Sequence, residues 1–216
     1  MITNVKPSAL YKNRYCSQGE FDIAVFGGRN KNYCRNEIVT ISFPDLKTSV
    51  EHSLIPPTRL LEKTVLIGSK LYIFDRVPKG GVYENIFEVY SMKTKVCKKL
   101  KLMDNQRINF SVCSFMNCVY FIGGYSNADG KYKAESYKYD SMNDNWRQIA
   151  SLHEQRCLSA CSVYEGKIVV TGGCSAKGHL KSVESFCHHE NKWKVLPDMI
   201  KSRYDHSSFT NGKKFL

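Results

Sequence analysis

The stretch Arg156–Trp193 decides the fold and reads RCLSACSVYEGKIVVTGGCSAKGHLKSVESFCHHENKW. At its centre the short run Ile168–Thr171 leads directly into the pair Gly172-Gly173. A run of this length without polar alternation is typical of a strand that is buried on both faces. A glycine pair at its end indicates a bend in which the backbone needs positive φ or close approach of another segment. The stretch therefore predicts an inner strand of a crowded β-structure.

The same run and bend return along the chain at a fixed interval. Three glycine pairs and one replacement follow equivalent runs, at Gly27-Gly28, Asp75-Arg76, Gly123-Gly124 and Gly172-Gly173. Successive pairs are 48, 48 and 49 residues apart. Self-similarity at a fixed period is the signature of a repeat architecture.

Two further series keep this register. Trp146 and Trp193 are 47 residues apart, and each follows an aromatic residue by seven positions. Arginines recur at Arg59, Arg107, Arg156 and Arg203, with spacings of 48, 49 and 47. The first three stand 16 residues before the next glycine pair or its replacement. Three series in one register favour true repeats over an irregular β-sandwich.

This pattern resembles the kelch motif, and the resemblance covers about residues 20–216. It implies an all-β, kelch-type β-propeller with about four of six blades present and an incomplete ring. We expect a lead-in over 1–20 and repeats over 21–68, 69–117, 118–166 and 167–211, with a truncated fifth repeat from 212. Arg107 to Trp146 and Arg156 to Trp193 match best.

The first two repeats depart from the motif. The first has Thr48 where a Trp is expected, and the second has Asp75-Arg76 in place of glycines. Asp tolerates a left-handed backbone better than most residues. We therefore expect a bend at Asp75, while Arg76 in the second glycine position weakens that expectation.

Composition limits the partners and the compartment. The net charge is +12, from Lys spread along the chain, which suits an acidic partner but lacks the concentrated basic and aromatic stripe of a nucleic-acid surface. Met1–Leu10 has no signal-like apolar region, and no run is long enough to span a membrane. Nine Cys, an odd number, predict reduced thiols in the cytoplasm. We expect neither nucleic acid nor membrane as a partner.

No enzyme, cofactor or metal site is predicted. The six His have no Ser or Cys partner at a catalytic spacing. A metal cluster could be imagined from Cys174, His179, Cys187, His188 and His189. It lacks metal-ligand spacing, and His188 and His189 would point to opposite faces of a strand. A copper-radical oxidase, which shares the propeller architecture, is the least favoured function.

The resemblance to kelch-like adaptor proteins places a substrate face at the residues after the glycine pairs and after the repeat arginines. The partner-binding candidates are Arg29, Asn30, Arg76, Asn109, Tyr125 and Tyr204, and Val77, Ile108, Cys157 and Cys174 occupy equivalent positions. Arg and Tyr suit capture of an acidic or hydrogen-bonding peptide. The alternative is that these are ordinary solvated loop residues.

The repeat arginines Arg107, Arg156 and Arg203 have two interpretations. The favoured one is structural, with each guanidinium donating to backbone carbonyls at a blade junction. The other is contact with a ligand at the central opening of the propeller.

By resemblance, the chain is the substrate-recognition part of a cullin-type ubiquitin ligase adaptor. The BTB and BACK domains that bind the cullin in that family are not expected here, because the segment before Phe21 is too short. The alternative is an actin-binding protein of the cytoskeleton, since a basic propeller suits an acidic filament.

Overall fold

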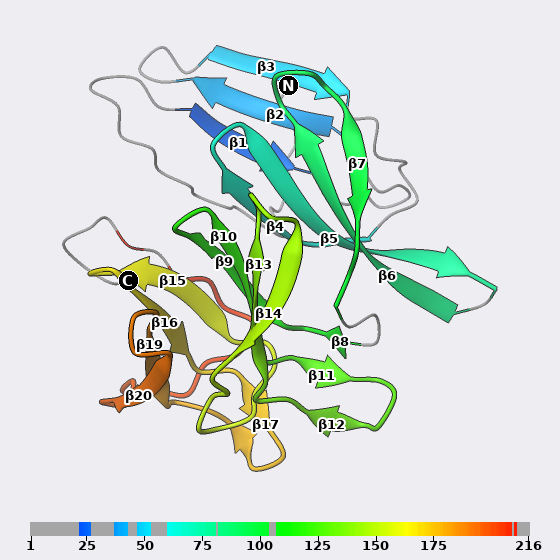
Figure 1. Ribbon diagram of the computed structural model, residues 1–216. Coiled ribbons are helices and arrows are strands. Elements are labelled where there is room, and N and C mark those ends of the chain that lie inside the picture. Colours follow the sequence, from blue (N-terminus) through cyan, green and yellow to red (C-terminus); the bar gives the residue numbers. More distant parts are fainter. Residues whose placement is uncertain are drawn as a thin grey trace, which may run out of the picture. The chain divides into compact units, whose positions relative to one another are not determined.

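A computed structural model describes residues 22–26, 37–42, 47–52, 60–80, 82–103, 107–208 and 210. Every element in these ranges is a strand (Figure 1). None of the described residues forms a helix with the length and apolar character needed to cross a membrane. Several predicted positions lie outside the described residues, namely Gly27, Gly28, Arg29, Asn30, Arg59 and the repeat from 212.

The chain divides into two compact units, Met1–Lys99 and Leu100–Leu216. The first contains an antiparallel sheet of β1 (Asp22–Phe26), β2 (Glu37–Ser42) and β3 (Lys47–His52). It also contains a four-stranded sheet in chain order, built from β4 (Leu60–Ile67), β5 (Lys70–Lys79), β6 (Val82–Ser91) and β7 (Cys97–Leu100).

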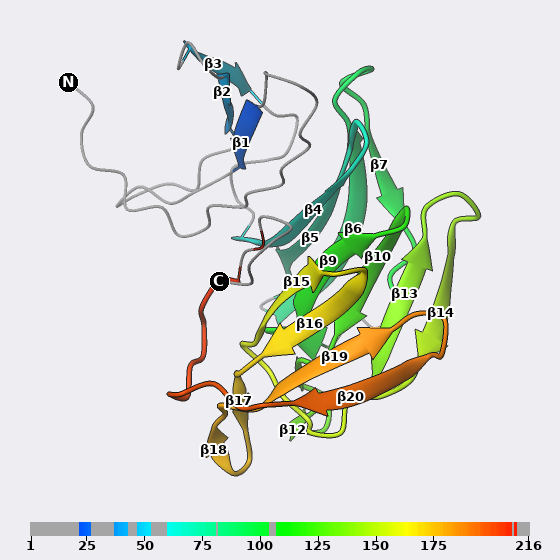
Figure 2. The same cartoon turned by 90° about the vertical axis from the view of Figure 1, so that its left-hand side faces the viewer.

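The second unit contains two four-stranded antiparallel sheets (Figure 2). One consists of β9 (Ser111–Phe115), β10 (Cys118–Ile122), β13 (Ser136–Asp140) and β14 (Asn145–Ile149). The other consists of β15 (Ala160–Tyr164), β16 (Lys167–Thr171), β19 (Val183–Cys187) and β20 (Lys192–Leu196). Short ribbons lie beside them: β8 (Arg107–Ile108), β11 (Tyr125–Ser126) and β12 (Lys131–Tyr132) in one, β17 (Cys174–Ser175) and β18 (Gly178–His179) in the other. These four-stranded sheets are the kelch blades that the repeats predicted.

The inner strands are buried along their whole apolar runs. Residues 71–74 of β5, 119–122 of β10 and 168–171 of β16 are all buried. Each of these strands has a paired strand on both edges. The absence of alternation in the sequence therefore identified strands with no water-facing side.

The core of the second unit lies between its two sheets. The buried cluster draws Tyr120, Ile122 and Ile149 from one sheet and Ile168, Val170, Phe186 and Trp193 from the other. The indole of Trp193 donates to the carbonyl of Ala150 at 2.8 Å, and Trp146 donates in the same way to Lys101. Each Trp thus anchors its outer strand to a backbone carbonyl more than 40 residues earlier in the chain.

The sheets begin one strand earlier than the sequence repeats. A repeat counted from its glycine-bearing strand starts at β5, β10 or β16, whereas the sheets start at β4, β9 and β15. Each sheet therefore takes its first strand from the end of one sequence repeat and its other three from the next.

The expected bend at Asp75 is absent. β5 continues through Asp75 and Arg76 to Lys79, paired with β6 without interruption, and Asp75 lies opposite Ile86. Asp75 is buried and does not have positive φ. The prediction was wrong because a backbone that can continue its strand hydrogen bonds has no need of the left-handed conformation that Asp merely tolerates.

Candidate partner-binding face

The glycine pairs of the second unit end the inner strands with left-handed backbone. Gly123 and Gly124 have φ of 61° and 108°, and Gly172 and Gly173 have φ of 56° and 102°. A Cβ on Gly123 would lie 2.5 Å from the carbonyl oxygen of Arg156, and one on Gly172 would lie 2.3 Å from that of Arg203. Only glycine can combine this φ with such close approach.

The second glycine of each pair forms a backbone hydrogen bond to the next repeat. The N–H of Gly124 donates to the carbonyl of Arg156, and that of Gly173 donates to the carbonyl of Arg203, each at 2.8 Å. The glycine pair is therefore the place where the backbone of the next repeat arginine passes. This explains why the two series share a register in the sequence.

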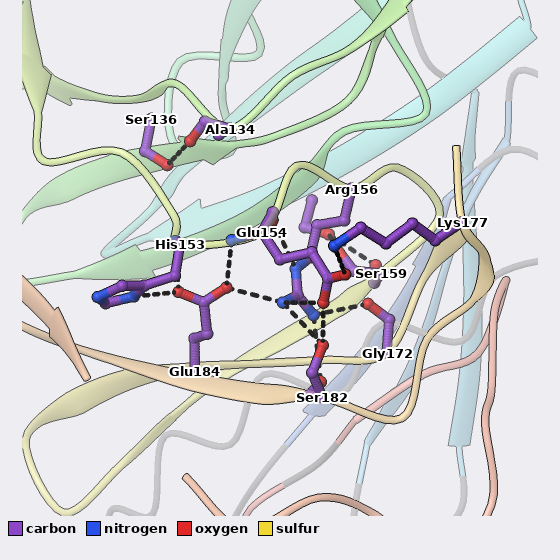
Figure 3. A network of polar contacts seen from close by, with 11 residues as sticks. Ala134, Ser136, His153, Glu154, Arg156, Ser159, Gly172, Lys177, Ser182 and Glu184 are labelled. Atoms are coloured by element: carbon purple, nitrogen blue, oxygen red, sulfur yellow. Dashed lines mark hydrogen bonds and ion pairs between the residues drawn. The ribbon is translucent and has the colours of Figure 1, made fainter. Parts of the chain in front are cut away.

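The guanidinium of Arg156 is fully buried at this junction (Figure 3). It donates to the carbonyls of Gly172 at 2.9 Å and Ser182 at 3.1 Å, and to the carboxylate of Glu184 at 2.7 Å. Glu184, itself 1% exposed, also accepts from the backbone N–H groups of His153 and Glu154. A buried ion pair with this many hydrogen bonds has its desolvation cost offset.

Arg107 makes the equivalent hydrogen bonds to backbone carbonyls in the preceding repeat. It donates to the carbonyls of Gly123 at 3.3 Å and Glu135 at 3.0 Å. Its guanidinium lies over the ring of Tyr137, 5.5 Å from the centroid. Tyr137 stands 47 residues before Glu184, in the equivalent position, so the repeat pattern gave no signal for the acidic residue.

Arg203 differs from the other two because its side chain is exposed. Arg107 and Arg156 each donate to the first glycine 16 residues later.

Two residues after each arginine, the backbone turns left-handed again. Asn109, Leu158 and Asp205 have φ of 53°, 53° and 49°. The N–H of Leu158 donates to the carbonyl of Asn109, and that of Asp205 donates to the carbonyl of Leu158, each at 2.8 Å. This hydrogen-bonded series joins three consecutive repeats at one end of the sheets.

The short ribbons and the residues after the arginines form one surface. Tyr125 pairs with Ile108 on one side and Tyr132 on the other, and the two Tyr rings are 5.3 Å apart. The ring of His179 stacks on that of Tyr204 at 4.2 Å. We call this surface the loop face and define it by Ile108, Asn109, Tyr125, Tyr132, Cys174, His179 and Tyr204. Both views place β12 and β17 at the same end of the second unit (Figures 1 and 2).

Charged side chains of both signs border the loop face. Lys133 donates to Asp129 at 2.6 Å, and this hydrogen bond lowers the pKa of Asp129 and raises the pKa of Lys133. The pair is neutral as a unit. Lys131, Lys177 and Arg203 are exposed cations, and Lys177 lies 4.0 Å from the Glu154 carboxylate.

The structure brings together three of the six predicted partner-binding residues. Asn109 and Tyr125 lie in neighbouring positions. Tyr204, which is 49% exposed, precedes Asp205, the third member of the hydrogen-bonded series that begins at Asn109. Arg76 belongs to the first unit, where it is half-buried and its backbone N–H donates to the Asp75 carboxylate at 2.6 Å. The sequence did not single out Tyr132 as part of the face, and considered His179 only as an unlikely metal ligand.

The residues once considered for a metal are dispersed. Cys174 and His179 are opposite each other in the β17–β18 ribbon, while Cys187 ends β19. His188 and His189 were expected on opposite faces of a strand, and this was wrong: they lie in a turn with their ring centroids 3.7 Å apart. In the described part of the chain, no three His, Cys, Asp or Glu side chains gather as a metal site would require.

A protein-family profile described as "Kelch motif" matches residues 106–153 and 155–200, the two parts that contain the sheets of the second unit. The chain carries kelch repeats. Its matched segments begin just before Arg107 and Arg156, so the kelch motif and the sheets share nearly the same boundaries.

Similar proteins bear kelch-like names. Kelch-like protein 41b of Danio rerio is 31% identical over 126 residues, which cover 58% of this chain and 20% of that protein. Kelch-like protein 9 of Mus musculus is 33% identical over 99 residues, which cover 44% of this chain and 16% of that protein. The chain thus spans about a fifth of the length of the curated relatives that it matches. Together, the repeats and these relatives support a protein-binding kelch domain.

Proposed function

We propose that the loop face binds a protein partner and that the chain is the substrate-recognition part of a cullin-type ubiquitin ligase adaptor. The observation that carries the first half is the exposed aromatic surface held on a buried framework. Tyr204 is half exposed, whereas Arg156 and Glu184 beneath the ribbons are buried and fully bonded. Loops on such a rigid base suit recognition.

The chemistry of the face favours an acidic or hydrogen-bonding peptide. Tyr125 and Tyr204 offer ring surface and a hydroxyl each, and aromatic residues of this kind dominate the energetics of interfaces. Lys131, Lys177 and Arg203 add exposed positive charge. Carboxylates are the groups that such cations attract.

The binding proposal is tested by capturing partners of the complete protein from cells with a Tyr125→Ala/Tyr204→Ala variant. We expect a partner bound by the natural chain to be lost in this variant. Met142→Ser is the matched control, because Met142 is 80% exposed in the turn between β13 and β14, at the opposite end of β13 from the loop face. Equal loss in the control, or retention by the double Tyr variant, would refute a binding role for the face.

The ligase proposal has a separate test. The complete protein is mixed with a purified cullin, and association is measured by size-exclusion chromatography. Complex formation supports the adaptor role. Persistent failure to associate would remove the ligase role and leave partner binding by the loop face intact.

Actin is the second candidate partner, and the observation in its favour is the net charge of +12. Co-sedimentation with filaments separates specific from general attraction. Specific binding should survive about 0.2 M salt, where exposed charges are largely screened. Loss of all binding by that concentration would assign the attraction to charge alone.

A further inference from the structure

Two cysteines of the second unit face each other across an isolated β-bridge. Cys157 follows the repeat arginine, and Cys174 follows the glycine pair. Each donates its backbone N–H to the carbonyl of the other, at 2.9 Å and 2.8 Å. Residues opposite each other in an antiparallel pair place their side chains on the same side. The two thiols are therefore neighbours.

The spacing of such a bridge suits a disulfide. Opposite residues of a hydrogen-bonded antiparallel pair have Cα atoms about 5.5 Å apart, and disulfides join Cα atoms about 4.4–6.8 Å apart. A disulfide requires a slightly shorter separation between the two Cβ atoms than an antiparallel pair provides, so the two residues must move closer together. The bridge is a single isolated pair beside Gly173.

We infer that Cys157 and Cys174 are a redox-active thiol pair, which closes to a reversible disulfide within the loop face when a small-molecule disulfide is supplied. The required adjustment leaves the bond strained, and strained disulfides are readily reduced. The inference rests on the bridge register and does not depend on the proposed binding function.

The exchange with oxidised glutathione proceeds in two balanced steps. The Cys174 thiolate attacks one glutathione sulfur, and the other glutathione leaves as a thiolate that takes up a proton. The Cys157 thiolate then attacks the Cys174 sulfur and expels the second glutathione in the same way. Two protein thiols are oxidised, and one glutathione disulfide is reduced to two thiols.

The structure orders these steps and sets their pH dependence. Cys174 is half-buried and reacts first, whereas Cys157 is 6% exposed. Burial and the neighbouring Cys174 raise the pKa of Cys157 to about 11, and burial and Asp205 raise the pKa of Cys174. Tyr132 and His179 are the other titratable groups beside the pair. The thiolates are therefore scarce at neutral pH, and the rate of closure should rise about tenfold for each pH unit below the pKa.

The test is oxidation of the folded full chain by oxidised glutathione, followed by acid quenching and peptide mapping. We expect the Cys157–Cys174 crosslink to dominate, to disappear with dithiothreitol, and to be replaced by a stable glutathione adduct on Cys174 in Cys157→Ser. The thiols of Cys113 and Cys161 also interact. This pair should stay reduced, because Cys113 is buried between the sheets.

A matched control places an engineered cysteine pair at the equivalent bridge of the preceding repeat. Ile108 and Tyr125 form the equivalent bridge in the preceding repeat. Ile108→Cys/Tyr125→Cys, in a chain that also carries Cys157→Ser and Cys174→Ser, should form the same crosslink. Two results with the folded natural chain would overturn the inference. One is a glutathione adduct on Cys174 without a Cys157–Cys174 crosslink, and the other is a crosslink between other cysteines in its place.

Discussion

The inner strand β5 and the equivalent strands β10 and β16 begin with the same kind of buried run, but the backbone at their ends differs. In all three the inner strand is a buried apolar run. At Gly123 and Gly172 the backbone then turns left-handed, and the next glycine donates its N–H to the carbonyl of the next repeat arginine. At Asp75-Arg76 the strand runs on, and all ten residues of β5 pair with β6. The apolar run makes the strand, and a glycine pair allows it to end in a bend that another backbone segment approaches closely.

This difference has a steric cause. The carbonyl that approaches Gly172 would lie 2.3 Å from any added Cβ, so a side chain there excludes the neighbouring backbone. A residue with a side chain does better by continuing the strand, which satisfies its N–H and C=O within the hairpin. The loop face follows the glycine pairs for this reason, because its ribbons start where the inner strands end.

The largest effect on the glycine-pair junction should come from Arg156→Met. The substitution leaves the Glu184 carboxylate buried without its cation, which costs about 3–5 kcal/mol. Denaturant unfolding measures the loss. Arg156→Met/Glu184→Met, which removes the carboxylate together with its cation, should recover part of the stability. A double variant that is no more stable than Arg156→Met would show that the unpaired carboxylate is not what makes Arg156 important.

Gly172→Ala should be next in size. It incurs about 1–2 kcal/mol for left-handed backbone and a further cost of about 1–3 kcal/mol for overpacking against the Arg203 carbonyl. Gly166→Ala is the matched control, since Gly166 has φ of 69° but nothing within 4 Å of an added Cβ. The difference between the two unfolding free energies isolates the close approach. No difference would mean that conformation alone selects the glycine.

The converse change is Asp75→Gly/Arg76→Gly, which asks whether a glycine pair is sufficient to end the strand. We expect the hairpin to keep its length and to lose about 1–2 kcal/mol from the added backbone entropy. Hydrogen exchange of the Val77 and Lys79 amides reports the outcome. Loss of their protection would mean that the pair alone creates the bend.

The smallest effect concerns Leu158, which adopts left-handed backbone in the series that joins the repeats. Leu158→Asn should raise stability by a few tenths of a kcal/mol, because Asn tolerates this conformation better than Leu. Leu158→Ala, which gains no such tolerance, serves as the comparison. A thermal melt in which both variants lose stability equally would indicate that the Leu side chain matters more than its backbone.

The sequence predicted features that recur and missed those that occur once. Inner strands, glycine bends and the positions of Tyr125 and Tyr204 follow from the period. Glu184 has a Tyr at its counterpart position, so no repeat pattern could identify it. The stacking of His179 on Tyr204 depends on how one ribbon folds back, which spacing does not encode. Asp75 was misjudged because tolerance of a conformation was weighed without the strand pairing that competes with it.

The most direct test of the loop face as the binding surface is site-specific photocrosslinking in cells. A photoreactive amino acid replaces Tyr204, Tyr125 or, as the control, Met142 in the complete protein. A common partner should be crosslinked from positions 204 and 125 and not from 142. Crosslinking from position 142 alone, or none from the two loop-face positions while a partner remains bound, would contradict the account.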